Sequence, residues 1–426
     1  MQHVASEHEA HSMASKARWI SVTLSQFNGL RTSVFHEGGH PIEAFVKPPA
    51  LPRQVAGLIC PFPNSSQAVR CFATQRPMGR LSGRITVAMS VSPLLAVEDL
   101  SVRIPLAAGE LNAVSNVSFS VMRGETLCFV GESGCGKTMT SLAVLRLLPK
   151  AARFSAKRVL FEDRDVTAAN ERGMARLRGK RIGMIFQDPM TSMNPVYTIG
   201  NQLEEVYLRH MPGSRRQARE RAEYLLSRVG IMSPRLRLAQ YPHELSGGLR
   251  QRMMIAMALI CEPTLIIADE PTTALDVTVQ VQILQLLVSL QREFGAALIL
   301  ITHSLGVVAR VADRVAVMYG GRIVETGPTE AIFAQPRHPY THGLLACLPS
   351  GQQHDRHARL QAIPGTVPSL IGETRGCEFR SRCPQARAGC AADIPVSTAE
   401  DGHLYRCVLP PGAIPPPQSA IRAGAA

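Results

Sequence analysis

The sequence contains no run of 18 apolar residues, so we expect none of its helices to span a lipid bilayer. Aromatic residues make up only 5% of the 426 positions, and they are not interleaved with clusters of lysine and arginine. Binding of nucleic acid therefore has little support, although the chain carries a net charge of +13. A basic excess of this kind also suits nucleotides and an anionic membrane surface, which the chain would reach through a partner.

Regular periodicity is absent from residues 1–88. Prolines and glycines interrupt this stretch, and its apolar and polar residues alternate without a helical or strand period. The start lacks the long apolar segment of a secretory signal, and four scattered glutamates argue against a transit peptide. We interpret 1–88 as an unstructured or misassigned extension and expect the natural start at Met89.

A phosphate-binding loop is present at residues 131–138, where the sequence fits G-x-x-x-x-G-K-[ST]. An apolar, β-prone segment precedes it at 126–130, and apolar residues at helical spacing follow it to Leu148. Glycines let the backbone wrap around an anion, while N–H groups and the helix dipole face that anion. We therefore predict that ATP binds here, with Lys137 at its β- and γ-phosphates and Thr138 on Mg²⁺. The loop residues are Gly131, Glu132, Ser133, Gly134, Cys135, Gly136, Lys137 and Thr138.

The spacing of apolar residues from Leu94 onward predicts an α/β fold. Residues 264–268 and 297–302 are nearly continuous apolar runs, as expected of central parallel strands, and a helix at 277–294 lies between them. A helical insertion is expected at about 195–250. The other predicted strands are an antiparallel pair at 95–102 and 114–121, a buried strand at 182–186, and a hairpin at 315–318 and 321–325.

Two acidic residues, Asp269 and Glu270, end the apolar strand at 264–268. A carboxylate at the tip of a buried strand is the usual means by which a nucleoside triphosphatase brings an acid to Mg²⁺. We therefore predict that Asp269 binds the metal. Glu270 is predicted to act as general base on the water that attacks the γ-phosphate.

A serine and two glycines, Ser246, Gly247 and Gly248, precede an apolar helix at 253–260. A hydroxyl and bare N–H groups at a helix N-terminus form a second anion site, although a serine here is equally expected as an ordinary helix cap. Two phosphate sites separated by an insertion cannot easily close on one nucleotide within one chain. Two chains arranged head to tail can, so we predict an ATP-bound dimer.

Taken in order, these motifs in residues 93–330 resemble the nucleotide-binding subunit of an ATP-binding cassette (ABC) transporter. The resemblance implies a P-loop NTPase cassette at 89–330, with a RecA-like core, an antiparallel β subdomain and a helical subdomain. It also implies further site residues. Gln187 resembles the Q-loop glutamine, which contacts Mg²⁺ and the attacking water, and Asp276 resembles the D-loop aspartate. His303 resembles the switch histidine, which contacts the γ-phosphate and positions the catalytic glutamate.

Three positions depart from the usual pattern of this family. Leu249 stands where glutamine or methionine is usual, and Ser304 stands where aspartate is usual. Residues 103–113 contain no aromatic side chain to stack on adenine, which leaves the adenine contact open. Because the residues for phosphate chemistry are all present, we expect an active ATPase.

The C-terminal region, 331–426, narrows the transported substrate. The segment His338-Pro339-Tyr340-Thr341, and residues 191–195 after the Q-loop, resemble oligopeptide, dipeptide and nickel importer ATPases. The resemblance implies uptake of di- or oligopeptides, with nickel or another small solute as an alternative. A soluble ABC ATPase is a more distant alternative, because the sequence shows no coiled-coil insertion, zinc-ribbon repeat or second cassette.

The same resemblance implies a peripheral position on the cytoplasmic side of the inner or plasma membrane. The implied partners are a second ABC ATPase subunit, identical or related, two transmembrane permease subunits and an extracytoplasmic substrate-binding protein. No nucleic acid is expected among them.

The C-terminal region lacks the C-x₂-C pairs typical of zinc sites, but it contains four cysteines in the spacing C-x₅-C-x₆-C-x₁₆-C. In a cytosolic chain such cysteines are thiols or ligands rather than disulfides. Four cysteines fit a [4Fe–4S] cluster, which the resemblance implies in some members, and four reduced thiols in a small helical cap are the alternative. The residues are Cys377, Cys383, Cys390 and Cys407.

Overall fold

The computed structural model describes most of the chain from residue 92 onward. The described residues are 92–272, 276–348, 362–372, 375–399, 402–410 and 412–414, together with the backbone of four short strands before them. The chain divides into two compact units, Met1–Ser92 and Pro93–Ala426.

The first unit contains two antiparallel pairs of strands. Strand β1 (Trp19–Val22) pairs with β4 (Ile85–Ala88), and β2 (Arg31–Phe35) pairs with β3 (Pro41–Phe45). These strands lie in the stretch 1–88 that we interpreted as an unstructured or misassigned extension, and that interpretation stays a prediction. Met89 lies outside the described residues, so a natural start there stays a prediction.

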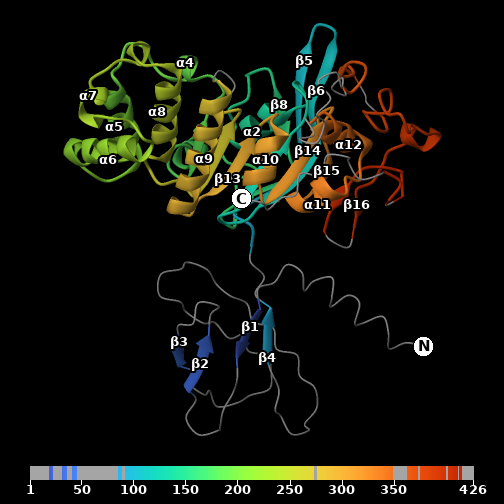
Figure 1. The fold of residues 1–426 in the computed structure, drawn as a ribbon, viewed down its shortest axis with the longest axis horizontal. Coiled ribbons are helices and arrows are strands. Elements are labelled where there is room, and N and C mark those ends of the chain that lie inside the picture. Colours follow the sequence, from blue (N-terminus) through green and yellow to red (C-terminus); the bar gives the residue numbers. More distant parts are fainter. Residues whose placement is uncertain are drawn as a thin grey trace, which may run out of the picture. The chain divides into compact units, whose positions relative to one another are not determined.

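An eight-stranded sheet lies at the centre of the second unit (Figure 1). Its strands, in spatial order, are β11 (Ile182–Ile185), β12 (Leu265–Asp269), β13 (Ala297–Ile301), β7 (Thr126–Val130), β14 (Arg314–Tyr319), β15 (Arg322–Pro328), β17 (Leu404–Tyr405) and β16 (Ser397–Thr398). Pairing is parallel from β11 to β14 and antiparallel beyond it. The carboxyl ends of the parallel strands therefore meet at one edge of the sheet, where ligands bind in open α/β sheets.

A second, antiparallel sheet shares a hydrophobic core with one face of the central sheet. It consists of β5 (Leu95–Leu106), β6 (Gly109–Val121), β8 (Arg153–Ser155), β9 (Arg158–Phe161) and β10 (Arg164–Asp165). Side chains of β7 alternate between two cores, because successive residues of a strand point to opposite faces. Leu127 and Phe129 join the core of the antiparallel sheet, and Cys128 and Val130 join the other. The predicted antiparallel pairing of β5 with β6 is confirmed.

Helices flank the parallel strands, and one of them has the predicted bounds. That helix, α9 (Val277–Phe294), begins where the Asp276 carboxylate accepts the Val279 N–H at 3.0 Å and ends at Gly295, whose φ is 63°. A short polar side chain at the start and glycine in the left-handed region at the end are strong helix boundaries. The other flanking helices are α2 (Lys137–Val144), α3 (Glu171–Leu177) and α10 (Leu305–Val311).

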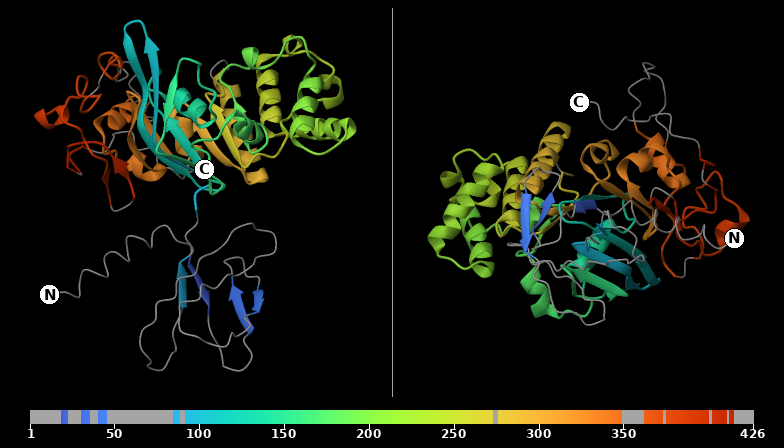
Figure 2. Two further views of the ribbon diagram at one scale, coloured as in Figure 1. Left: turned by 180° about the vertical axis from the view of Figure 1, so that it is seen from behind. Right: turned by 90° about the horizontal axis from the view of Figure 1, so that it is seen from below.

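A helical subdomain lies between β11 and β12 in the sequence. It contains α4 (Pro189–Ser192), α5 (Ile199–His210), α6 (Arg215–Arg228), α7 (Pro234–Leu238), the 3₁₀ turn η1 (Pro242–Glu244) and α8 (Gly247–Leu259). We expected this subdomain at about 195–250, and its last helix, α8, ends at Leu259. Figures 1 and 2 show these helices at the opposite end of the second unit from the C-terminal region.

The C-terminal region begins with α11 (Thr329–Ala334) and α12 (Pro339–Ala346). It then follows an irregular path, with the 3₁₀ turn η2 (Ala388–Ala391), and returns to add β17 to the edge of β15. We did not expect this addition to the central sheet. Within the described residues, no helix combines the length and the apolar character that crossing a membrane requires.

Glycine 183 of β11 should be essential for packing, because a Cβ atom there would lie 2.4 Å from the carbonyl oxygen of Ala258 in α8. We expect Gly183→Ala to lower the free energy of unfolding by about 1–3 kcal/mol, as overpacking does, which thermal unfolding would measure. Gly306→Ala is the control. A Cβ at this glycine of α10 meets no atom within 4 Å, so it should be neutral or stabilising. Equal melting temperatures for the two variants would contradict the prediction.

Candidate nucleotide-binding site

The phosphate loop joins β7 to α2 and contains three glycines with positive φ. The angles are 151° at Gly131, 79° at Gly134 and 102° at Gly136. A Cβ atom would lie 2.2 Å from the carbonyl oxygen of Met318 at Gly131, and 2.5 Å from that of Ala113 at Gly136. Neither position has space for a side chain, so glycine is required by both conformation and packing. The loop can thus follow an anion closely and present N–H groups at the start of α2.

The ammonium group of Lys137, the first residue of α2, lies within the loop. Its Nζ donates hydrogen bonds to the carbonyl oxygens of Gly131, at 2.9 Å, and Glu132, at 3.0 Å. The side chain is buried, so little water screens its charge. A buried cation therefore stands where we predicted contact with the β- and γ-phosphates.

Thr138 and Asp269 lie side by side although 131 positions separate them. The Thr138 hydroxyl donates to Asp269 Oδ1 at 3.0 Å. Burial at the end of β12 raises the pKa of the Asp269 carboxyl to about 6; the Thr138 hydrogen bond opposes this shift and the charge of Glu270 adds to it. A buried carboxylate next to a hydroxyl offers the oxygen ligands that Mg²⁺ prefers, and a cation there would favour its ionised form.

The three predicted catalytic residues meet after the ends of β11, β12 and β13. The side-chain amide of Gln187 donates to Glu270 Oε2 at 3.0 Å, and His303 Nδ1 lies 3.9 Å from the same oxygen. Glu270 itself has a φ of 43°, in the left-handed region that non-glycine residues seldom adopt. Its N–H donates to the carbonyl oxygen of Ile301 at 3.0 Å, which holds this conformation. Strained backbone of this kind often marks functional sites.

The serine and glycines of the second anion site lie on the helical subdomain. Ser246 precedes α8 and accepts an N–H of its first turn at 3.4 Å, and Gly247 and Gly248 form that turn. In Figures 1 and 2 this helix stands among those of the subdomain, apart from α2. Asp276 is exposed and caps α9. The two residues before Asp276 lie outside the described residues.

Two side chains from the C-terminal region also bind the phosphate loop, and the sequence analysis missed both. The backbone N–H of Glu132 donates to the hydroxyl of Tyr340 at 2.8 Å. The guanidinium of Arg382 pairs with the carboxylate of Glu132 at 2.6 and 3.0 Å. No local pattern around either residue predicts these contacts, because they join positions 208 and 250 residues apart.

The four C-terminal cysteines are free thiols, close enough for their charges to influence one another. Burial raises the pKa of Cys377 to about 12, and the neighbouring Cys390 and Cys407 contribute to the shift. Cys377 Sγ also lies 3.9 Å from His338 Nε2. Across the described ranges, however, no three His, Cys, Asp or Glu side chains are arranged to hold a metal ion. The structure therefore gives no support to the predicted cluster beyond the proximity of the thiols.

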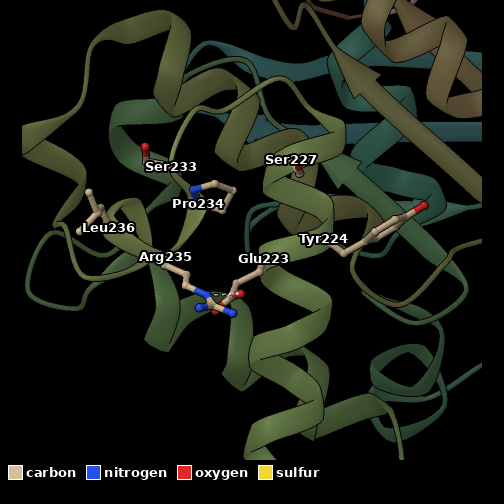
Figure 3. Close-up of a pocket in the computed structure, with 7 residues that line it drawn as sticks. All are labelled: Glu223, Tyr224, Ser227, Ser233, Pro234, Arg235 and Leu236. Carbon is tan, nitrogen blue, oxygen red and sulfur yellow. Dashed lines mark hydrogen bonds and ion pairs between the residues drawn. The ribbon is translucent and has the colours of Figure 1, made fainter.

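A hollow of about 460 Å³ lies on the helical subdomain, between α6 and α7 (Figure 3). An ion pair between Glu223 and Arg235 crosses it at 2.9 Å, and Tyr224 and Leu236 contribute apolar surface. None of the predicted nucleotide-binding residues lines this hollow, so it is separate from the site described above.

Comparison with protein families gives two matches, one after the other along the chain. Residues 114–273 match the family described as ABC transporter, and residues 324–390 match the oligopeptide/dipeptide transporter, C-terminal region. The first match contains the phosphate loop, Gln187, Ser246, Asp269 and Glu270. The second contains three of the four clustered cysteines.

The similarity to individual relatives extends over nearly the whole length of each relative. A putative peptide import ATP-binding protein of Brucella abortus (strain 2308) is 49% identical over 331 residues, 75% of this chain and 98% of the relative. The dipeptide transport ATP-binding protein DppD of Bacillus subtilis (strain 168) is 49% identical over 318 residues, 74% and 94% of the two chains.

A solved structure with the same fold is a dimeric ATP-binding cassette in a post-hydrolysis state, bound to ADP and Pi. It is 25% identical, with a TM-score of 0.50 over 55% of this chain and 98% of that one. Fold, site geometry and relatives agree. The chain belongs to the ABC transporter family, among the ATP-binding proteins that carry the oligopeptide/dipeptide transporter C-terminal region.

Proposed function

We propose that this chain hydrolyses ATP to power the import of di- and oligopeptides across a cytoplasmic membrane. The observation that carries the ATPase part is the meeting of Lys137, Thr138, Asp269 and Glu270 at one edge of the sheet. The C-terminal region and the names of the relatives support peptide import. Nickel or another small solute is the alternative cargo, and a soluble ABC ATPase is a more distant alternative.

The side chains suggest how hydrolysis proceeds. Lys137 and the loop N–H groups neutralise charge that develops on the phosphates, while Thr138, Asp269 and the amide oxygen of Gln187 would hold Mg²⁺. The bound metal would supply further neutralisation of the phosphate oxygens. Glu270 accepts a proton from water as that water attacks the γ-phosphorus, and the bond to ADP breaks.

We further propose that each site is completed by a second cassette. Ser246, Gly247 and Gly248 lie on the helical subdomain, so they would contact nucleotide held by the loop of the partner subunit. Asp276 would lie near the same junction, since it starts the helix that follows the Asp269–Glu270 segment. His303 would contact the γ-phosphate while holding Glu270. The similar solved cassette is dimeric, which is consistent with this arrangement.

The proposed setting is peripheral, on the cytoplasmic face of the membrane. Two permease subunits would form the transmembrane path, and an extracytoplasmic binding protein would deliver the peptide. The second cassette is either an identical chain or a related one. Co-purification with permease subunits would separate this function from that of a soluble ATPase, for which no such complex is expected.

Glu270 is the proposed general base of ATP hydrolysis. We expect Glu270→Gln to retain ATP binding and to lower turnover by about 10²- to 10⁴-fold, because the amide cannot accept the proton. Phosphate release and equilibrium ATP binding should be measured on the same preparation. Glu330→Gln, at an exposed carboxylate of α11, is the control and should hydrolyse ATP normally. Turnover of Glu270→Gln close to the wild-type value would exclude Glu270 as the base.

A shared site would need the phosphate loop of one chain and the Ser246–Gly248 segment of another. Lys137→Ala and Gly247→Asp should each be inactive, the latter because its carboxylate repels the γ-phosphate. Mixing the two chains restores one intact site in mixed dimers, so activity should approach roughly a quarter of the wild-type value if copies assort at random.

The control for this mixing experiment carries both substitutions in one chain. Mixed with Lys137→Ala, it should restore nothing, because no chain then supplies the lysine. A mixture of the two single variants that stays as inactive as its components would contradict site sharing between copies of this chain.

A [4Fe–4S] cluster at the four C-terminal cysteines stays a prediction from the sequence. If Cys377, Cys383, Cys390 and Cys407 hold it, protein purified without oxygen should be brown and contain iron. Cys383→Ala should then lose both properties, whereas Cys261→Ala, at a buried cysteine of the helical subdomain, should keep them. Iron-free, colourless and fully folded wild-type protein would count against the cluster.

A further inference from the structure

The C-terminal region holds the phosphate loop at Glu132. Its carboxylate accepts hydrogen bonds from both terminal nitrogens of Arg382, at 2.6 and 3.0 Å, and its backbone N–H donates to the hydroxyl of Tyr340 at 2.8 Å. The carbonyl of the same residue accepts a hydrogen bond from Lys137 Nζ at 3.0 Å. Glu132 thus links the C-terminal region directly to the lysine that would bind the phosphates.

The Arg382 side chain is also held by contacts outside the phosphate loop. Its side chain is only 5% exposed. Its Nε donates to the carbonyl of Pro364 at 2.8 Å, and its terminal nitrogens also donate to the carbonyl of Ile363, at 3.1 Å, and the hydroxyl of Tyr319, at 3.3 Å. A guanidinium held on several sides presents a rigid, two-pronged surface that matches one carboxylate.

A cluster of three aromatic side chains packs next to Arg382 and Glu132. The ring centroid of Tyr319, the last residue of β14, lies 4.6 Å from that of Tyr340 and 5.2 Å from that of Phe379. The centroids of Tyr340 and Phe379 are 5.3 Å apart. The cluster packs α12 and the segment carrying Arg382 against the central sheet. The guanidinium therefore has little freedom to move away from Glu132.

Charge gives this contact a role in nucleotide binding. A carboxylate in a loop that receives a polyphosphate repels its ligand, and the repulsion is strong where water is scarce. Arg382 compensates that carboxylate through two charge-assisted hydrogen bonds. Without the arginine, the loop would lose a restraint, and the bound phosphates would face an unpaired negative charge.

We propose that Arg382 is a positioning residue for nucleotide binding, which holds Glu132 and thereby lets the C-terminal region set the affinity of the phosphate loop for ATP. The proposal rests on the proposed binding of ATP to residues 131–138. It assigns Arg382 no contact with the nucleotide, and its effect passes through Glu132 alone.

A double-mutant cycle on the full chain tests this proposal, with a non-hydrolysable ATP analogue and Mg²⁺ as the probe in calorimetric titration. Arg382→Gln should weaken binding about tenfold, since it leaves a carboxylate unpaired beside the ligand. Adding Arg382→Gln to a chain that already carries Glu132→Gln should weaken binding little further, because no carboxylate is then left unpaired. In steady-state assays, Arg382→Gln should raise KM for ATP and leave kcat nearly unchanged, because the interaction is not specific to the transition state.

Arg380→Gln is the matched control, because this neighbouring arginine is exposed. It should bind the analogue as wild type does. Wild-type protein that fails to bind the analogue would refute the proposed function itself. The positioning role alone would be refuted if wild type binds normally but Arg382→Gln loses the same affinity in the wild-type and in the Glu132→Gln background. The effect would then not pass through the pair.

A milder variant covers the case in which Arg382→Gln does not fold. Arg382→Lys keeps the positive charge but loses the two-pronged geometry, so binding should weaken about threefold. The loss should disappear when Glu132 is glutamine. A lysine variant that binds the analogue as tightly as wild type would overturn the proposal.

Discussion

The backbone of the phosphate loop comes so close to two other strands that two of its glycines have no substitute. Gly131 faces the carbonyl of Met318 in β14, and Gly136 faces the carbonyl of Ala113 in β6. One of these strands belongs to the central sheet and the other to the antiparallel sheet. The loop is therefore fixed by both sheets at once. That close contact sets the position of Lys137, of the loop N–H groups and of the start of α2.

The carboxyl ends of the parallel strands supply the second half of the site. Because β11, β12 and β13 are adjacent and parallel, the residues that follow them meet at one edge although they are far apart in sequence. Glu270 gathers Gln187 and His303 around one carboxylate oxygen, in a backbone conformation that costs free energy. The rigid sheet beneath supplies the stability that lets such a conformation persist.

Sequence alone predicted the parts whose signals are local. The buried strands β12 and β13 are continuous apolar runs, and α9 is bounded by Asp276 and Gly295, so their bounds follow from neighbouring residues. The two-residue strand β17 carries no such signal, because its pairing with β15 depends on where the C-terminal region returns. In the site, the phosphate loop, Asp269 and Glu270 were predicted because each follows a strand or opens a helix, whereas Gln187, Asp276 and His303 were predicted from the resemblance to the ABC family. Arg382 was not, since its importance depends on a carboxylate 250 positions away.

The contact between Arg382 and Glu132 acts in both directions. If the C-terminal region favours the form of the loop that accepts nucleotide, thermodynamic linkage requires nucleotide to favour, by the same factor, the docked form of that region. The aromatic cluster around Tyr319 and the thiols on either side of Arg382 would then open to solvent less often in the loaded protein than in the unloaded one. The occupancy of the ATP site would in this way govern how readily reagents in the surrounding solution reach Cys377 and Cys383.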